Sequence, residues 1–218
     1  MRFRRRDLRV WTCAVLLGVA VALPAGRAAE DTSRDRLADA PAGPAVRAWR
    51  AGAYAFSDEL GGFRILSVSG RGTRADPIVL VQEFASASPV TLVIRAIGPV
   101  RAFAHEEGVA NGFIRLVVVA VNGSGLAWSQ FEFELQETLG EPSVYGDGLS
   151  FDQNRRDGDG IVSDAFGRFD RAYEPHDRLR FEDGFVDPGK QARFAFLISD
   201  FTPVAEFYLV QDPRIPAS

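Results

Sequence analysis

The residues most capable of chemistry lie in an acidic stretch at 152–164, which reads DQNRRDGDGIVSD. Ca²⁺ is bound by oxygen ligands, and irregular loops rich in Asp and Gly offer both carboxylates and free carbonyls. The spacing does not fit an EF-hand, because a loop counted from Asp152 has Asp157 where the sharp turn needs Gly. A looser calcium site is one interpretation, with ligands drawn from Asp152, Asn154, Asp157, Asp159 and Asp164. The other is a solvated acidic turn, since Asp and Gly both suit turns; its carboxylates would pair with Arg155, Arg156 and Arg168.

A second set of carboxylates follows Trp128 in the run WSQFEFELQE. Residues two apart on a strand point to the same face and lie about 7 Å apart, which is close to the spacing of carboxylate pairs that hydrolyse glycosides. We expect Trp128 to share that face with Glu132 and Glu134, where its ring could stack on a sugar. The sequence therefore contains one candidate for a carbohydrate site.

These carboxylates form the pattern E-x-E-x-x-E, which resembles the E-x-D-x-x-E signature of a jelly-roll glycosidase family. The resemblance implies that Glu132 is the nucleophile, Glu137 the acid/base and Glu134 the helper, although the family has Asp at the helper position. It covers only these six residues. The interpretation we favour is a half-buried strand with solvent-facing acids, because glycosidase clefts carry many aromatic side chains and only two Trp follow residue 28.

The remaining polar residues suggest no further catalytic set. His105 and His176 have no neighbouring residues at metal-ligand spacing, so hydrogen-bonding or surface roles are expected for both. No serine stands in a nucleophile-elbow pattern, and no Gly-rich segment has the strand–turn–helix setting of a phosphate-binding loop. Apart from a bound calcium ion, the sequence predicts no cofactor.

The N-terminus has the layout of a secretory signal peptide. Arginines occupy positions 2, 4, 5, 6 and 9, an apolar run covers 11–23, and small residues precede an expected cleavage near Ala28. The apolar run is short for a membrane span, which needs roughly 20 residues, so a signal anchor is the alternative. We expect a protein secreted to the periplasm or the extracellular space, with no stable membrane span after cleavage. Export by the general or the twin-arginine route stays open.

Removal of residues 1–28 would leave an acidic protein without thiols. The whole chain has a net charge of −4, and residues 1–28 carry six Arg and one Asp, so the remainder has a net charge of −9. This charge argues against nucleic acid or an anionic membrane as a partner. The single cysteine, Cys13, lies within the predicted signal, so the secreted form depends on core packing alone for its stability.

The rest of the chain predicts a short N-terminal leader at 29–51 and one domain at 52–218. The domain consists of β-branched and aromatic runs separated by Gly, Pro and Ser, without a sustained helical period. This pattern predicts an all-β fold, an antiparallel β-sandwich of the jelly-roll or immunoglobulin-like kind. We expect a central strand at 112–122, a hairpin turn at 122–125, and a following strand at 126–136 that buries Phe131, Phe133 and Leu135. The other expected strands lie at 62–70, 77–84, 90–95, 178–181, 192–198 and 206–211.

The C-terminal half, about residues 119–213, resembles the β-sandwich domain of exported bacterial surface proteins that end in a sorting anchor. The resemblance is carried by the segments WSQFEFEL at 128–135, GLSF at 148–151, SDAF at 163–166 and FYLVQDP at 207–213. It implies an extracellular module and brings no catalytic residues with it. The sequence given ends PRIPAS without an apolar helix or a basic tail, so we expect a released protein.

Together these features predict a secreted β-sandwich with a structural or binding role and no catalysis, with calcium as a candidate stabiliser. Its partner is expected to be a protein or a polysaccharide. The alternative is a carbohydrate-binding protein or glycoside hydrolase that uses the face of Trp128, Glu132, Glu134 and Glu137.

Overall fold

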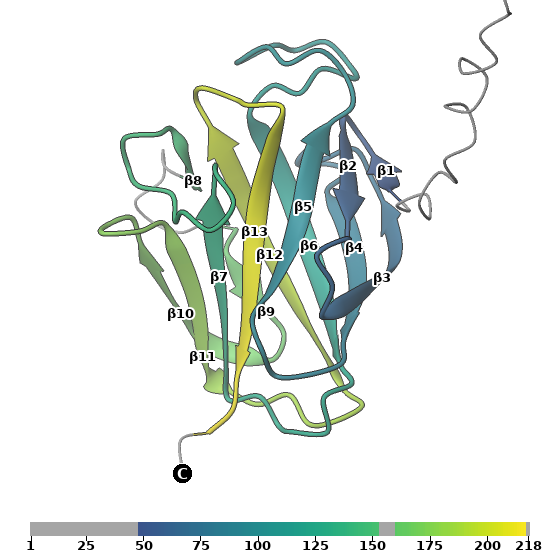
Figure 1. The fold of residues 1–218 in the computed structure, drawn as a ribbon, viewed down its shortest axis with the longest axis vertical. Coiled ribbons are helices and arrows are strands. Elements are labelled where there is room, and N and C mark those ends of the chain that lie inside the picture. The colour runs from purple at the N-terminus through teal and green to yellow at the C-terminus, as the bar shows by residue number, and fades with distance from the viewer. Residues whose placement is uncertain (1–47, 153–159, 217–218) are drawn as a thin grey trace, which may run out of the picture. The chain divides into compact units, whose positions relative to one another are not determined.

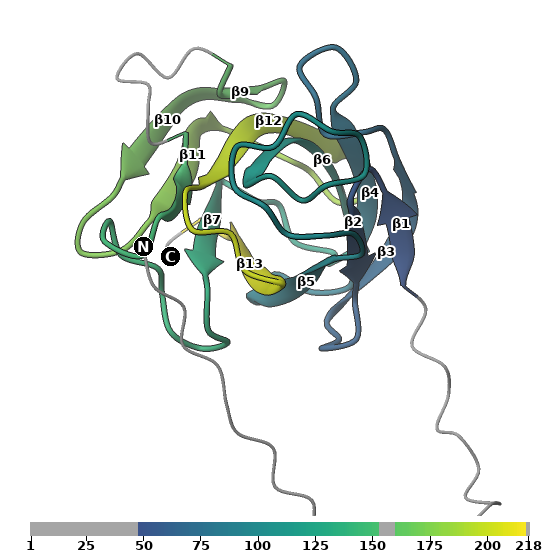
Figure 2. The ribbon, with the colours of Figure 1, turned by 90° about the horizontal axis from the view of Figure 1, so that it is seen from above.

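The computed structural model describes residues 48–152 and 160–216, and all regular structure in these residues is β. The predicted antiparallel β-sandwich is confirmed: two sheets face each other across one core (Figures 1 and 2). The strands are β1 Trp49–Ala51, β2 Tyr54–Ser57, β3 Phe63–Ser69, β4 Ile78–Phe84, β5 Val90–Ala96, β6 Phe113–Asn122, β7 Gln130–Gln136, β8 Leu149–Phe151, β9 Val162–Ser163, β10 Phe166–Ala172, β11 Arg178–Gly184, β12 Gln191–Asp200 and β13 Glu206–Arg214.

The first sheet has seven strands in the order β1-β2-β5-β13-β7-β11-β10, all paired antiparallel. The second sheet has the order β3-β4-β6-β12-β8, and β9 also pairs with β12. Its β4–β6 pair is parallel, because the chain visits the first sheet as β5 between these two strands. The expected central strand is confirmed as β6, which lies between β4 and β12.

Phenylalanine rings from both sheets fill the space between them. Phe131 of the first sheet lies 4.7 Å from Phe194 of the second, and Phe133 lies 4.9 Å from Phe196, measured between ring centroids. These distances fall in the range preferred by aromatic pairs. The expected inward stripe is confirmed, since Phe131, Phe133 and Leu135 are completely buried.

One pair of amides interrupts this apolar core. Gln82 of β4 and Gln211 of β13 are completely buried and come from opposite sheets. Gln82 Nε2 donates to Gln211 Oε1, and Gln211 Nε2 donates back to Gln82 Oε1 at 3.2 Å. Each amide therefore satisfies the other, which offsets the cost of removing both from water.

Two local expectations were wrong. The turn at 122–125 does not close a hairpin, because β6 and β7 belong to different sheets. Asn122 instead organises the crossing: its Nδ2 donates to the carbonyls of Leu126 and Val186 at 2.7 and 2.8 Å. The leader was expected to extend to residue 51, but Trp49–Ala51 forms β1 and pairs with β2.

The predicted signal peptide at 1–28 and most of the leader lie outside the described residues. Within residues 48–152 and 160–216, no helix is long and apolar enough to span a membrane. Export and cleavage near Ala28 stay predictions.

Candidate functional site

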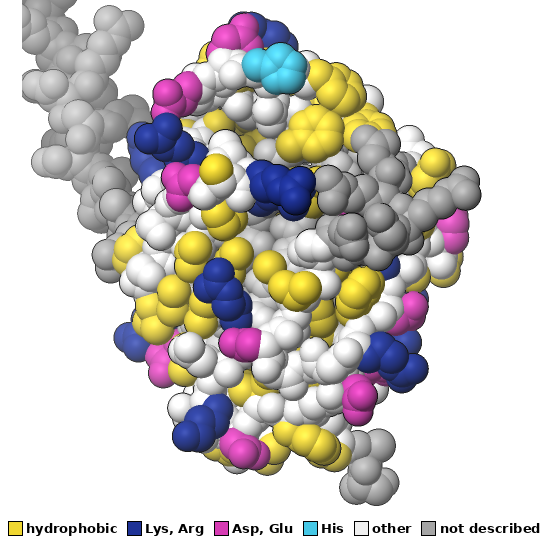
Figure 3. Space-filling view, turned by 180° about the vertical axis from the view of Figure 1, so that it is seen from behind, with side chains coloured by type: hydrophobic (Ala, Val, Ile, Leu, Met, Phe, Trp, Pro, Cys, Tyr) yellow, Lys and Arg dark blue, Asp and Glu magenta, His cyan; other side chains and the backbone are white. Residues whose placement is uncertain are grey.

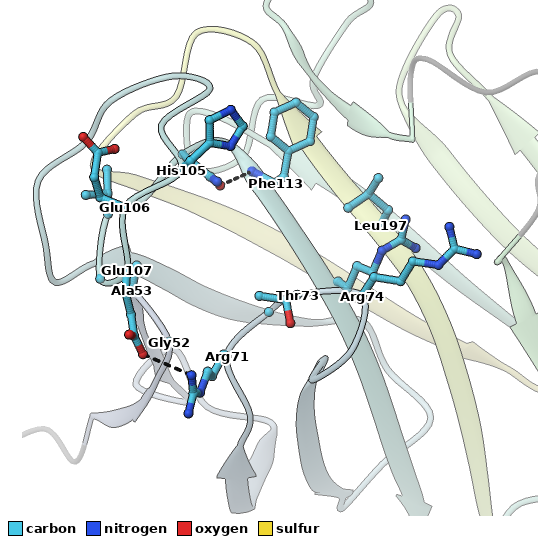
Figure 4. A pocket seen from close by; sticks show the side chains of 15 residues that line it. Gly52, Ala53, Arg71, Thr73, Arg74, His105, Glu106, Glu107, Phe113 and Leu197 are labelled. Carbon is cyan, nitrogen blue, oxygen red and sulfur yellow. Dashed lines mark hydrogen bonds and ion pairs between the residues drawn. The ribbon is translucent and has the colours of Figure 1, made fainter.

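A pocket of about 720 Å³ opens at one end of the sandwich (Figure 4). Its floor is the outer face of the second sheet, where Phe113 and Arg115 of β6 lie beside β12. Leu197 of β12 is the direct cross-strand partner of Arg115, so these two side chains are neighbours on that face. Two connections form its walls: residues 70–77 between β3 and β4, and residues 97–112 between β5 and β6.

Loop 70–77 is fixed to the floor by backbone hydrogen bonds. The amide of Arg115 donates to the carbonyl of Gly72 at 2.9 Å. Within the loop, the amides of Arg71 and Thr73 both donate to the carbonyl of Asp76 at 3.1 Å. Gly72 has a φ of +84°, and a Cβ there would lie 3.3 Å from the side chain of Ile78. Glycine is therefore suited to this position, which sets where the neighbouring side chains enter the pocket.

Loop 97–112 carries its own hydrogen bonds. The amide of Arg101 donates to the carbonyl of Ala110 at 3.0 Å, and the amide of Phe103 donates to the carbonyl of Asn111 at 3.1 Å. The Asn111 side chain also bridges two parts of the loop: its Nδ2 donates to the carbonyl of Ala104, and its Oδ1 accepts from the amide of Phe113. A long connection held in this way can present side chains in a fixed arrangement.

Arg71 joins the two walls. Its guanidinium lies 3.2 Å from Glu107 of loop 97–112 and 3.7 Å from Asp76 of its own loop. All three side chains are largely exposed, so each pair contributes little to stability, at most about 1 kcal/mol. Arg71 is therefore shared between two carboxylates, and this group of three side chains carries a net charge of −1. Glu106 on the same wall is paired as well, with Arg101 at 2.9 Å.

The other two arginines of the pocket have no partner among the described residues. Thirteen arginines fall within the described residues, and nine of them bond a carboxylate or a backbone carbonyl through the side chain. Among these described residues the remaining four make no such contact, and two of the four, Arg74 and Arg115, line this one pocket. Figure 4 shows Arg74 beside Leu197, on the side of the pocket opposite Glu106 and Glu107. Two guanidinium groups without a partner among the described residues thus line the pocket together with the apolar side chains of Phe113 and Leu197.

An aromatic cluster adjoins the pocket. The ring of Phe113 lies 5.6 Å from that of Phe103 and 6.1 Å from that of Phe201, measured between centroids. Phe103 is 55% exposed and has a φ of +59°, a conformation that is rare for a residue with a bulky side chain. Such local strain is typical of functional loops and is maintained here by the surrounding hydrogen bonds.

The outer face of the second sheet continues below the pocket with two valines of β6, Val117 and Val119, that are themselves buried. Alternation along β6 turns Ile114, Leu116 and Val118 into the core, and turns Val117 and Val119 to the opposite face. Figure 3 views the molecule from this side and shows hydrophobic side chains gathered around a few arginines.

The three carboxylates at 132–137 lie in different surroundings. Glu132 is only 8% exposed on the outer face of the first sheet, where Arg214 and Arg178 approach its Oε1 at 3.3 and 3.8 Å. Glu134, on the same face, accepts a hydrogen bond from Gln136 at 2.9 Å. Glu137 lies beyond the end of β7, and burial raises its pKa, with smaller contributions from Asp147 and Asp200. Glu132 and Glu137 therefore have different charged neighbours.

Trp128 does not share the face of Glu132, contrary to expectation. Its ring is completely buried and packs edge-on against Phe84 and Phe131 at 5.5 and 5.6 Å. Its Nε1 donates to Ser124 Oγ at 3.2 Å. The reason lies in the backbone: Trp128 pairs with Val186 in an isolated bridge before β7 begins at Gln130, so the alternation along β7 does not extend to it. A ring without exposed surface cannot stack on a sugar.

The acidic stretch is described only at its ends. Asn154, Asp157 and Asp159 lie outside the described residues, so the predicted calcium site stays a prediction. Asp152 is buried, and Asp164 accepts a hydrogen bond from the amide of Arg193 at 2.7 Å. Within residues 48–152 and 160–216, no three His, Cys, Asp or Glu side chains are grouped to hold a metal ion. Arg168 pairs with Glu182 of the neighbouring strand at 2.6 Å.

The structure also contains a buried acid that the sequence did not suggest. Asp177 is completely buried just before β11, and Ser150 Oγ donates to its Oδ1 at 2.8 Å. No hydrogen-bond partner reaches its Oδ2. Burial raises the pKa of Asp177 to about 7, and the nearby carboxylates of Asp147 and Glu174 add to the effect. This carboxyl group therefore titrates near neutral pH.

No protein-family model matches the chain, and no curated protein or solved structure matches it significantly. The site is therefore interpreted from its own geometry. His105, predicted to have no ligand role, lies at the exposed rim of the pocket. Sequence reasoning missed the pocket because its lining comes from separate segments, and Arg74 and Arg115 stand in no recognisable motif. The one available signal was the long connection between β5 and β6, since long ordered loops are often functional.

Proposed function

We propose that this protein is an exported binding domain that takes up a ligand in the pocket between loops 70–77 and 97–112 without converting it. The observation that carries the proposal is the pairing of an apolar floor with the unpaired guanidinium groups of Arg74 and Arg115. Small-molecule sites are usually concave and combine apolar side chains with a few polar groups that fix orientation, and about 720 Å³ lies within their usual size. Export and the extracellular setting belong to this proposal and rest on the N-terminal sequence.

The position of the pocket in the fold supports a binding role. Its floor belongs to β6 and β12, which exchange nine register pairs in the centre of the second sheet. Its walls are hydrogen-bonded loops at the end of this rigid scaffold. Binding sites are commonly built in this manner, with specificity carried by loops on a framework that does not move.

The glycoside hydrolase alternative receives no support from the geometry. Trp128 is in the core, and the carboxylate of Glu132 is compensated by Arg178 and Arg214. A nucleophile and an acid/base of a retaining glycosidase need carboxyl groups that face each other across an open cleft, about 5 Å apart. We therefore place the ligand at the pocket and not on the outer face of the first sheet.

A thermal-shift screen of the chain after residue 28 tests the proposal. The probes are small aromatic and aliphatic acids, the corresponding neutral alcohols, and neutral and acidic oligosaccharides. A ligand present at ten times its Kd stabilises the folded state by about 1.4 kcal/mol, which shifts the Tm of a domain of this size by several degrees.

Two variants in loop 97–112 assign any shift to the pocket. Val109→Trp places a large ring inside the lining and should abolish the shift. Val100→Trp is the matched control, because Val100 is an exposed residue of the same loop outside the lining. If no probe shifts the Tm, or if Val109→Trp leaves the shift unchanged, the proposal is wrong.

A further inference from the structure

We propose that the pocket selects an oxyanion joined to an apolar group. The oxyanion contacts the guanidinium groups of Arg74 and Arg115, and the apolar group lies against Phe113 and Leu197. This inference rests on the proposed function, and it names the class of ligand. A carboxylate, a sulfate and a phosphate share the required chemistry, since each presents two or more oxygens to the planar fork of an arginine.

The pocket lining carries more positive than negative side chains. It holds three arginines, Arg71, Arg74 and Arg115, and two acids, Glu106 and Glu107. Ion pairs already occupy Arg71 and both acids, as described above. Arg71 is shared by Glu107 and Asp76, and Arg101 pairs with Glu106, so Arg74 and Arg115 are the two lining arginines without a carboxylate partner among the described residues.

The arginines of the pocket differ in charge from the rest of the protein, which is acidic. The chain outside residues 1–28 has a net charge of −9, and most of the described arginines have partners. Two uncompensated cations in one cavity repel each other, and a bound anion relieves that repulsion. The pocket is therefore a region of local positive charge that attracts anions, in a molecule that is otherwise acidic.

Arg115 is partly buried. Its side chain is half-buried, its backbone amide donates to the carbonyl of Gly72, and Leu197 is its cross-strand partner. A hydrogen bond between a charged donor and an anion is stronger in such a setting than on an open surface, because the local dielectric is lower. Arg74 is exposed at the rim of the pocket. It therefore attracts and orients an anion, whereas its hydrogen bonds to that anion remain accessible to water.

The floor of the pocket offers apolar side chains to a ligand. Phe113 and Leu197 are both half-buried, so each keeps surface that a ligand can cover. The Phe103 and Phe201 rings extend this surface beyond the pocket. Covering apolar area is favourable, so a ligand with an aryl or alkyl group should bind better than a bare anion.

Isothermal titration calorimetry with five probes tests this inference. The probes are 3-phenylpropionate, phenyl phosphate and phenyl sulfate as amphipathic anions, 3-phenylpropanol as the neutral analogue, and inorganic phosphate as the bare anion. We expect at least one amphipathic anion to bind about tenfold or more tightly than both the alcohol and inorganic phosphate. The rank order of the three amphipathic anions identifies the preferred oxyanion.

Three arginine variants assign the effect to the two unpaired groups. Arg115→Gln should weaken the best anion by about ten- to a hundredfold and Arg74→Gln by less, and both should leave the affinity for 3-phenylpropanol unchanged. Arg50→Gln is the matched control, because Arg50 is an exposed and unpaired arginine among the described residues that does not line the pocket. Circular dichroism spectra confirm that each variant is folded.

The possible failures are distinguishable. Equal affinity for the alcohol and the anions, with no effect of Arg115→Gln, overturns the ligand class and leaves the proposed function standing. Equal affinity for inorganic phosphate and the amphipathic anions shows an anion site without a role for the floor, which also overturns the inference. No binding of any probe, here and in the broader thermal-shift screen, overturns the inference and the proposed function together.

Discussion

Replacing Asp177 by Asn should remove much of the pH dependence of folding stability between about pH 4 and pH 7. Asp177 is 0% exposed, and among the described residues its one side-chain hydrogen bond is that which Oδ1 accepts from Ser150. Burial raises its pKa from 3.8 to about 7. Asn keeps the size of the side chain and an oxygen for Ser150, but it has no proton to lose.

The direction in which Asp177 changes folding stability with pH follows from the linkage between protonation and folding. The pKa of Asp177 is higher in the folded state than in the unfolded state, so the folded state binds the proton more tightly. The resulting contribution to stability is fully present below pH 3.8, falls as the pH rises, and is lost once the pH has passed about 7. The slope is at most about 1.4 kcal/mol per pH unit for one proton, and the two pKa values set a limit on the order of 4 kcal/mol.

Urea denaturation of both proteins between pH 4 and pH 8 measures this difference. Other groups contribute to the wild-type curve, for example Asp200, whose pKa burial raises, and Glu59, whose pKa a hydrogen bond from Arg95 lowers to about 2. The difference between wild type and Asp177→Asn isolates the one carboxyl group. We expect the variant to gain stability relative to wild type by a few kcal/mol between pH 4 and pH 8. Parallel curves would refute this account of Asp177, and the exposed Asp170→Asn provides the control.

Three further predictions concern the core, the buried amides and calcium. Phe133→Ala should cost about 4 kcal/mol of unfolding free energy, whereas Phe185→Ala, at a position 68% exposed, should change it by less than about 0.5 kcal/mol; similar values would contradict the assigned core. Gln82→Leu should destabilise by about 2 kcal/mol because it leaves the Gln211 amide unpaired, and the double variant with Gln211→Leu should recover most of the loss; additive losses would contradict the reciprocal pairing. If calcium binds the 152–164 stretch, a chelator should lower the Tm by several degrees, and a change under about one degree would count against that site.

The central strands could be predicted because their chemistry is local. Phe131, Phe133 and Leu135 alternate with polar residues, and a strand with one buried face requires this pattern. The alternation fails where strands are short or buried on both sides. All four residues of β2, Tyr54–Ser57, are buried, so that strand shows no alternation and was not predicted.

The site could not be predicted because pairing in three dimensions defines it. The sequence contains many arginines, and nothing in their spacing shows that Arg71 is paired while Arg74 and Arg115 are not. That distinction depends on Glu107, which lies far along the chain and is brought to Arg71 by loop 97–112. The error over Trp128 has a similar cause, since a pairing with Val186 outside the regular strand determines which way the ring faces.

The most direct test of the proposed site is a ¹H–¹⁵N NMR titration of the chain after residue 28 with 3-phenylpropionate. The proposed function and ligand class predict that the largest amide shifts cluster at loop 70–77, loop 97–112 and the adjoining ends of β6 and β12. They also predict that Arg115→Gln suppresses these shifts. The proposed site is wrong if the shifts centre on Glu132 and its neighbours on the first sheet. It is also wrong if neither this ligand nor its phosphate and sulfate analogues cause saturable shifts.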